Sequence, residues 1–215
     1  MSDATEIYAG HPLWRELRNG LLWHRTSTTD YRQIRADGLI KPNDGRVDRW
    51  GGKYACQQLG GVSLFDFTSQ PEDLIFGEVH KWSPFLSHSG PVTVLLGLEK
   101  SKLPGRLTPY PENKEGTTGN VIPYVEVCHC GAIPISAAIS YLLVCAVDYR
   151  GFKKLDSLNE QSLAKAEIDL ASFTLAVKQE DAKQSKKFRE IMESPKVKAM
   201  MEEGKRRASE IMNRR

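Results

Sequence analysis

The sequence predicts an α+β protein in which a folded N-terminal domain is followed by a helical extension. Within roughly the first 150 residues, short segments rich in apolar and β-branched residues alternate with turns and with segments of helical spacing. After Gly151 the strand-like character is lost, and residues 159–193 have a helical composition. We therefore expect one domain over residues 1–152 and a basic, helical C-terminal extension over residues 153–215.

The composition is typical of a globular protein. The chain has 215 residues, of which 40% are hydrophobic and 27% are charged, so it can bury a core without disulfides or metals. No apolar run approaches the ~18 residues that span a bilayer. The N-terminal residues carry no basic segment followed by an apolar one. We therefore expect a cytoplasmic protein without a membrane partner.

The first two elements are a strand and a helix. Residues 21–26 (LLWHRT) have the character of a short buried strand. Ser27 and Asp30 form a weak capping-box pattern directly after it, and Gly38 stands where a helix would end. Residues 41–53 then contain Pro, Asn, Asp and several Gly residues, which predicts a loop.

Further strands follow, separated by one helix and a long loop. Residues 60–67 (GGVSLFDF) predict a strand, and Ser69 with Glu72 forms a capping box for a helix that runs to about Trp82. The remaining segments of this domain are strands at 92–98, 121–130 and 141–147 and a Pro- and Gly-rich loop at 104–120. In the extension, Pro195 should separate two helices.

The four cysteines show no metal-binding or disulfide pattern. Cys128 and Cys130 flank His129, but alternate residues of a strand point to opposite faces, so the two thiols would face away from the imidazole. The other two cysteines, Cys56 and Cys145, have no regular spacing to this pair. We expect reduced, mostly buried thiols and no metal.

The positive charge is concentrated at the C-terminus. Residues 178–215 hold twelve Lys and Arg and seven Asp and Glu, a balance of +5, whereas the rest of the chain holds eighteen and twenty, a balance of −2. Such a segment is compatible with a nucleic acid, with an acidic protein or with a solvated surface.

Polar residues within apolar strands are the best candidates for chemistry. The chain has no GxGxxG after a strand, no GxxxxGK[ST], no GxSxG and no HExxH. It does place His24 and Thr26 in the first strand, Ser63 in the second and Glu126 between Val125 and Val127. A carboxylate in such surroundings is costly to bury unless it has a partner or a function.

The order of these residues resembles the ADP-ribosyltransferase superfamily over residues ~20–148. LWHRTSTTDYRQIRADGLI is similar to the family's first motif, a strand bearing His followed by a helix. GGVSLFDF is similar to the second motif, and PVTVLLGLEKSKLPGRL to the core strand. VIPYVEVCHCGAIPISAAISYLLV is similar to the final motif, with its Glu, a G-x-I-P segment and a closing strand. The pattern is closest to the His/Glu-type branch, including the DarT-like and PARP-like transferases.

The resemblance implies a split, mostly antiparallel sheet and an enzyme that transfers ADP-ribose from NAD to a macromolecule. NAD is then a substrate, and no metal is required. Glu126 would stabilise the oxocarbenium-like state at the ribose, and His24 would hydrogen-bond the ribose and adenosine side of NAD. Thr26 and Ser63 would add further hydrogen bonds.

The remaining NAD contacts are less well defined. Ser63 stands where many family members have a Tyr that stacks on nicotinamide, so an aromatic ring from Phe65, Phe76 or Tyr54 would have to replace it. Arg46 and Arg49, in the glycine-rich loop, are the candidates for binding the NAD phosphates.

Two other functions fit the same fold. One is an RNA 2′-phosphotransferase, which would bind phosphates through basic residues such as Arg25, Arg46 and Arg49. The other is a catalytically silent module that binds NAD or nucleic acid. The sequence leaves open the acceptor (DNA, RNA or protein), the biological role and the oligomeric state.

Overall fold

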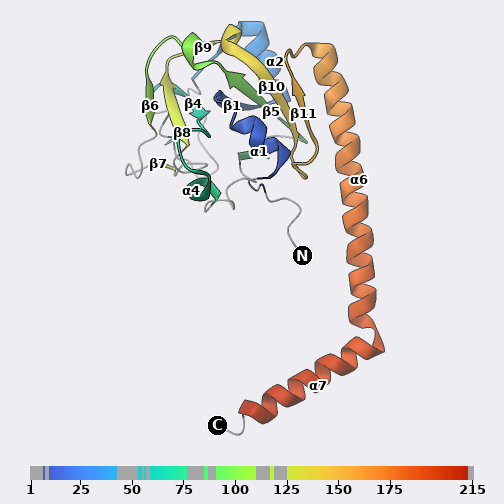
Figure 1. The fold of residues 1–215 in the computed structure, drawn as a ribbon. Coiled ribbons are helices and arrows are strands. Elements are labelled where there is room, and N and C mark those ends of the chain that lie inside the picture. Colours follow the sequence, from blue (N-terminus) through green and yellow to red (C-terminus); the bar gives the residue numbers. More distant parts are fainter. Residues whose placement is uncertain are drawn as a thin grey trace. The chain divides into compact units, whose positions relative to one another are not determined.

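The chain divides into two compact units, Met1–Thr174 and Leu175–Arg215. The computed structural model describes residues 7, 10–42, 53–54, 56, 59–76, 85–86, 91–109, 117–118 and 125–212 (Figure 1). Each unit is described by itself below.

The first unit is built on a seven-stranded sheet in which every neighbouring pair is antiparallel. The order is β11-β10-β5-β1-β4-β8-β6. The strands are β1 (Leu22–Ser27), β4 (Gly61–Phe65), β5 (Val92–Leu98), β6 (Leu107–Pro109), β8 (Glu126–Cys130), β10 (Ala138–Cys145) and β11 (Phe152–Leu155). The α+β class and the mostly antiparallel sheet predicted from the sequence are confirmed.

Two short pairs of strands accompany this sheet. One is antiparallel, between β2 (Leu39–Ile40) and β9 (Ile133–Pro134). The other is parallel, between β3 (Lys53–Tyr54) and β7 (Thr117–Thr118).

Seven helical elements are described, and α2 begins and ends at residues that the sequence marks. The elements are α1 (Pro12–Leu17), α2 (Thr28–Asp37), α4 (Glu72–Phe76), η2 (Lys100–Lys102), η3 (Ile135–Ala137), α6 (Glu160–Glu193) and α7 (Pro195–Met212). At the start of α2, the Ser27 hydroxyl accepts a hydrogen bond from the Asp30 amide at 2.9 Å, as the capping pattern predicts. Gly38 ends α2 in the left-handed region, with φ of 68°, which suits a residue without Cβ.

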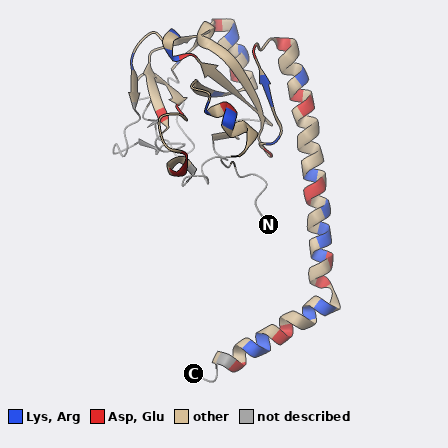
Figure 2. Ribbon diagram, in the orientation of Figure 1, with Lys and Arg blue, Asp and Glu red and all other residues tan. Residues whose placement is uncertain are grey.

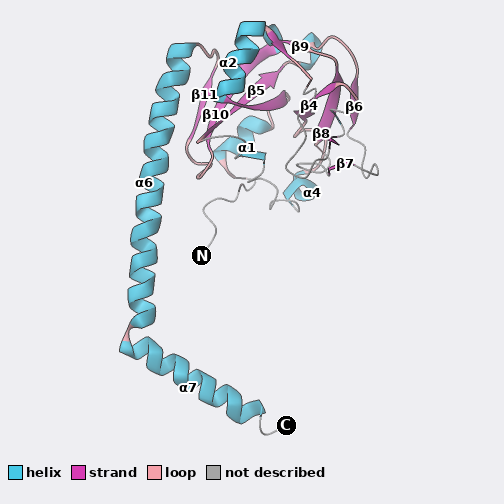
Figure 3. Cartoon of the chain, turned by 180° about the vertical axis from the view of Figure 1, so that it is seen from behind, coloured by secondary structure: helices cyan, strands magenta, loops and turns pink. Residues whose placement is uncertain are grey.

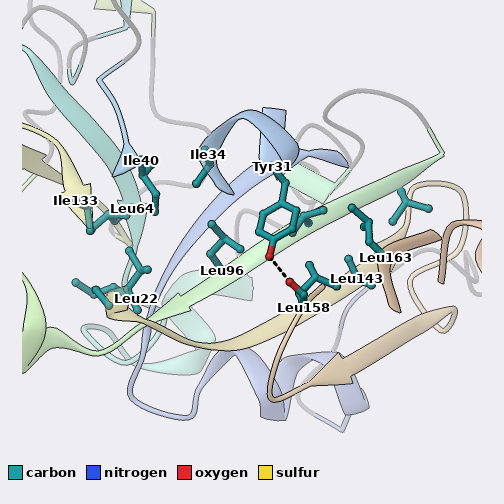
Figure 4. Packing of buried hydrophobic residues seen from close by; sticks show 14 of the residues in the cluster. Leu22, Tyr31, Ile34, Ile40, Leu64, Leu96, Ile133, Leu143, Leu158 and Leu163 are labelled. Atoms are coloured by element: carbon teal, nitrogen blue, oxygen red, sulfur yellow. Dashed lines mark hydrogen bonds between the residues drawn. The ribbon is translucent and has the colours of Figure 1, made fainter. Parts of the chain in front are cut away.

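Each face of the sheet buries its own apolar cluster. On one face, α2 lies across β1 and β5 (Figure 3), and Tyr31 and Ile34 pack on Leu96 (Figure 4). The other face is covered by Leu13, Trp14 and Leu17 of α1 together with Ile75, Phe85 and Leu86. Because both faces are covered, a polar side chain on a central strand is buried unless the sheet opens locally.

The first unit extends beyond residue 152, where the sequence suggested a boundary. Strand β11 pairs with β10, with Tyr141 opposite Leu155, so residues after 152 belong to the sheet. The first turns of α6 then bury Leu163, Ala166 and Leu170 in the cluster on the α2 side. Helical spacing alone could not show that this part of α6 packs on the sheet, because an amphipathic helix looks the same wherever it docks.

Tyr31 joins α2 to the segment that leads into α6. Its hydroxyl donates a hydrogen bond to the Leu158 carbonyl at 2.7 Å (Figure 4). Tyr31→Phe should therefore lower the free energy of unfolding by about 1 kcal/mol, measured by urea denaturation. Tyr141→Phe is the control, because the described part of the chain gives its hydroxyl no hydrogen-bond partner, and it should change stability by less than about 0.5 kcal/mol. Equal losses in both variants would contradict the role of this bond.

The same hydroxyl should make stability depend on alkaline pH. Burial raises the pKa of Tyr31 from 10.0 to about 12 in the folded protein. The unfolded hydroxyl therefore ionises first, and the free energy of unfolding should fall as pH rises from 10 to 12. Tyr31→Phe removes the hydroxyl, so the free energy of unfolding of this variant should fall less as pH rises from 10 to 12.

Two of the four cysteines form a disulfide, so the expectation of four reduced thiols is wrong. Cys56 and Cys128 are bonded and buried, with their Cα atoms 5.4 Å apart, whereas Cys130 and Cys145 are free. Gly61 leaves room for the bond, because a Cβ there would lie 2.3 Å from the Cys128 Sγ. The two cysteines are 72 residues apart, and only the fold brings them together. Disulfides are rare in the cytosol, so this bond removes part of the support for a cytoplasmic location.

Candidate active site

The three strands that carry the candidate residues lie side by side in the sheet. The order β1-β4-β8 places His24, Ser63 and Glu126 on consecutive strands. The pairing between the first two is short, since only Trp23 and Phe65 stand in register. By contrast, β1 pairs with β5 along its whole length. The sheet therefore opens between β1 and β4 on the side of His24 and Ser63.

His24 bridges this opening. Its Nδ1 lies 3.1 Å from the carbonyl oxygen of Ser63. A carbonyl only accepts hydrogen bonds, so Nδ1 carries the proton in this contact. In a continuous ladder, a backbone amide of β1 would bind that carbonyl. The imidazole thus satisfies a backbone group that the divergence of the strands leaves without its usual partner.

Ser63 also binds the buried carboxylate. Its hydroxyl donates to Oε1 of Glu126 at 2.5 Å, a short bond typical of an O–H group and a carboxylate. Glu126 is only 5% exposed, so this bond offsets part of the cost of burial. In the β4–β8 register, Ser63 stands opposite Cys128, and Phe65 opposite Glu126. The Cys56–Cys128 disulfide therefore lies directly beside the Ser63–Glu126 pair.

Ser63 is the residue through which His24 and Glu126 are joined. Strand alternation places His24 on the side opposite Trp23, which packs in the same cluster as Phe65. Ser63 and Glu126 lie on the Phe65 side of their strands. Alternation therefore places the His24 and Glu126 side chains on opposite faces of the sheet, which counts against the expectation that both face one cleft. A ligand that contacts both would have to lie between β1 and β4.

Two other predicted site residues, Thr26 and Phe65, are also buried. Thr26 is buried, opposite Val94 in the β1–β5 ladder. Phe65 is 1% exposed, and its ring centroid lies 4.6 Å from that of Phe85 in an edge-to-face contact. Phe65 is therefore part of the interior, and its ring offers no open face for a nicotinamide.

The other predicted NAD-contact residues lie partly or wholly outside the described residues. Arg46 and Arg49 lie outside the described residues. The backbone of Tyr54 forms part of β3, and that of Phe76 ends α4, but their side chains lie outside the described part of the chain.

Arg25 is a residue whose position the sequence did not reveal. Its guanidinium donates to the Phe85 carbonyl at 3.2 Å and lies 5.9 Å from the centre of the Phe85 ring. Alternation places it on the Trp23 side of β1, the side shared by Ser63 and Glu126. The only signal in the sequence was a charged residue inside an apolar strand.

His129 is held by backbone carbonyls. Its Nε2 lies 3.0 Å from the Pro104 oxygen, and its Nδ1 lies 3.3 Å from the Gly131 oxygen. Among the residues that the structure describes, no group of three or more His, Cys, Asp or Glu side chains could hold a metal ion.

Comparisons with family models, with curated proteins and with solved structures found no match to this chain. Within the described residues, no helix is long and apolar enough to cross a membrane.

Proposed function

We propose that the chain is an NAD-dependent ADP-ribosyltransferase, which transfers ADP-ribose to a macromolecular acceptor and releases nicotinamide. The observation that supports it best is the buried Glu126 carboxylate, held by the Ser63 hydroxyl beside the opening that His24 bridges. A buried carboxylate is a suitable group for stabilising positive charge. The order of His24, Ser63 and Glu126 along the chain agrees with the family resemblance.

The reaction would proceed at C1′ of the nicotinamide ribose. The bond from C1′ to the ring nitrogen breaks, and nicotinamide leaves with the electron pair. The ribose develops oxocarbenium character, which the Glu126 carboxylate stabilises. A nucleophile of the acceptor then forms the new bond to C1′, and its proton passes to Glu126 or to water. Ser63 fixes the direction of the carboxylate, and His24 hydrogen-bonds NAD.

The two alternatives make different demands on the site. An RNA 2′-phosphotransferase needs several cations around a phosphate, and Arg25 is the candidate on the Glu126 side of β1 in the described part of the chain. A silent binding module would bind NAD without releasing nicotinamide.

Labelled NAD tests the proposal directly. The full chain is incubated with cell extract and with NAD that carries the label on its adenylate phosphate. Nuclease and protease digestion then show whether the label resides in DNA, RNA or protein. The expected result is a labelled macromolecule together with free nicotinamide. NAD binding without release of nicotinamide would favour the silent module, and an absence of both would overturn the proposal.

His24→Ala should weaken NAD binding about 10- to 100-fold and also slow transfer. The substitution removes a ligand contact and leaves the Ser63 carbonyl without the imidazole. Calorimetric titration with NAD gives the dissociation constant, and nicotinamide release gives the rate. Gln33→Ala on the exposed surface of α2 is the control and should change neither. Unchanged NAD affinity in His24→Ala would remove His24 from the site.

A further inference from the structure

The final helix, α7, combines an exposed apolar sector with flanking positive charges. At 3.6 residues per turn, one sector of about a third of its circumference contains Val197, Met200, Met201, Gly204, Ala208 and Met212. Large apolar side chains in this sector stand in water. Met200 is 66% exposed, Met201 47% and Met212 78%.

Cations line both edges of this apolar sector. Lys198 and Lys205 flank one edge, and Lys196 and Arg207 flank the other. The far side contains the three acidic residues of the helix, Glu202, Glu203 and Glu210, together with Arg206, which pairs with Glu203. Figure 2 shows the positions of Lys, Arg, Asp and Glu along α7.

Ion pairs within the helix do not remove this pattern. Lys205 contacts Glu202 at 3.0 Å, and Arg207 contacts Glu203 at 2.9 Å. All four side chains are exposed, and such pairs contribute little in water and are easily exchanged. In the described residues, Lys196 and Lys198 form no ion pair.

The charge pattern discriminates between possible partners. A second copy of α7 would bring the cations at its edges against those of the first, which is unfavourable. A nucleic acid would attract the cations but would leave the methionines in water. An anionic bilayer surface accepts the apolar side chains between its headgroups and pairs the flanking cations with phosphates.

We propose that α7 binds the surface of membranes that contain anionic phospholipids, lying in the plane of the headgroups. The apolar sector faces the acyl chains, the flanking Lys and Arg reach the phosphates, and the acidic face remains in water. This inference is independent of the NAD chemistry, because every residue that carries it belongs to the second unit.

Vesicle flotation with the full chain tests the proposal. The vesicles are pure phosphatidylcholine, or phosphatidylcholine with about a third phosphatidylserine. The protein should float with the anionic vesicles, remain unbound with the neutral ones and dissociate as salt is raised.

Two variants that each lose four positive charges show whether the cations beside the apolar sector contribute more to vesicle binding than cations elsewhere. Replacing Lys196, Lys198, Lys205 and Arg207 together with Gln should reduce vesicle binding at least about 100-fold, since each cation near an anionic surface contributes about 5-fold. The control replaces Lys41, Lys100, Lys102 and Lys154 of the first unit with Gln and should reduce binding less than about 10-fold, because these exposed cations lie outside α7.

The double variant Met200→Gln with Met201→Gln tests the apolar contribution. It keeps every charge and should still weaken vesicle binding at least about 10-fold. Circular dichroism of each variant must show the helix content of the original chain.

Three results would overturn the proposal. One is equal loss of binding in the two charge variants. Another is full vesicle binding by the methionine variant. The third is an absence of vesicle binding together with salt-dependent retention on DNA or RNA, which would assign the cations to a nucleic acid.

Discussion

Glu126→Gln should lower the rate of ADP-ribose transfer at least about 100-fold while changing NAD affinity less than about 3-fold. Glutamine keeps the size of the side chain and an oxygen that can accept the Ser63 hydrogen bond. It removes the negative charge that stabilises the oxocarbenium-like state, and that interaction is strongest in the transition state. The measurements are initial rates of nicotinamide release at saturating NAD and a dissociation constant from calorimetry.

Two further variants test whether the loss of rate is specific to the Glu126 charge. Glu72→Gln removes an exposed carboxylate of α4, and its rate should stay within about 2-fold of the original. Ser63→Ala removes the bond that directs the carboxylate and should lower the rate about 10-fold, less than the loss of the charge itself. Transfer at the original rate by Glu126→Gln would exclude Glu126 as the catalytic carboxylate.

Trp23→Ala should lower the free energy of unfolding by about 3–5 kcal/mol, the largest loss of stability expected for a single change in the sheet. Trp23 is 0% exposed, and its Nε1 donates to the Leu17 carbonyl at 2.9 Å, so it ties α1 to β1. Gly97 on β5 leaves space for the indole, because a Cβ there would lie 2.9 Å from Trp23 Cζ3. Chemical denaturation followed by circular dichroism gives the free energy of unfolding.

Matched substitutions separate packing from the hydrogen bond. Trp23→Phe keeps most of the apolar contact but loses the Nε1 donor, so it should cost about 1–2 kcal/mol. Leu74→Ala removes an apolar side chain that is partly exposed on α4 and should cost less than about 1 kcal/mol. If Trp23→Ala cost no more than Leu74→Ala, the indole would not join α1 to the sheet.

The elements that the sequence predicted best are those set by local interactions. The β1–α2 segment depends on an apolar strand, the Ser27 cap and Gly38, and all three act within a few residues. Strand β5 was recognisable because it is buried on both faces and therefore apolar throughout.

The features that were missed depend on residues far apart in the chain. The disulfide joins Cys56 to Cys128, and no regular cysteine spacing predicts this pairing. Phe65 lies beside Glu126 in register, and the sequence could not show that Phe85 covers its ring.

The candidate site also depends on residues far apart in the chain. The sequence placed His24, Ser63 and Glu126 in strands because polar residues interrupted apolar patterns. It could not show that the Ser63 carbonyl contacts His24 while the Ser63 hydroxyl binds Glu126. That arrangement follows from the divergence of β1 and β4, which arises from sheet packing rather than from any short segment.

The single registered pair between β1 and β4 has a mechanical consequence. The half containing β11, β10, β5 and β1 is joined to the half containing β4, β8 and β6 mainly by side-chain packing, including that of Trp23 and Phe65. Substitutions at these buried rings should therefore disturb the junction between β1 and β4 more than substitutions elsewhere in the sheet. Phe85 packs against Phe65, which stands opposite Glu126 in register, so a smaller side chain at Phe85 should loosen the packing behind the candidate site without removing any of its polar groups.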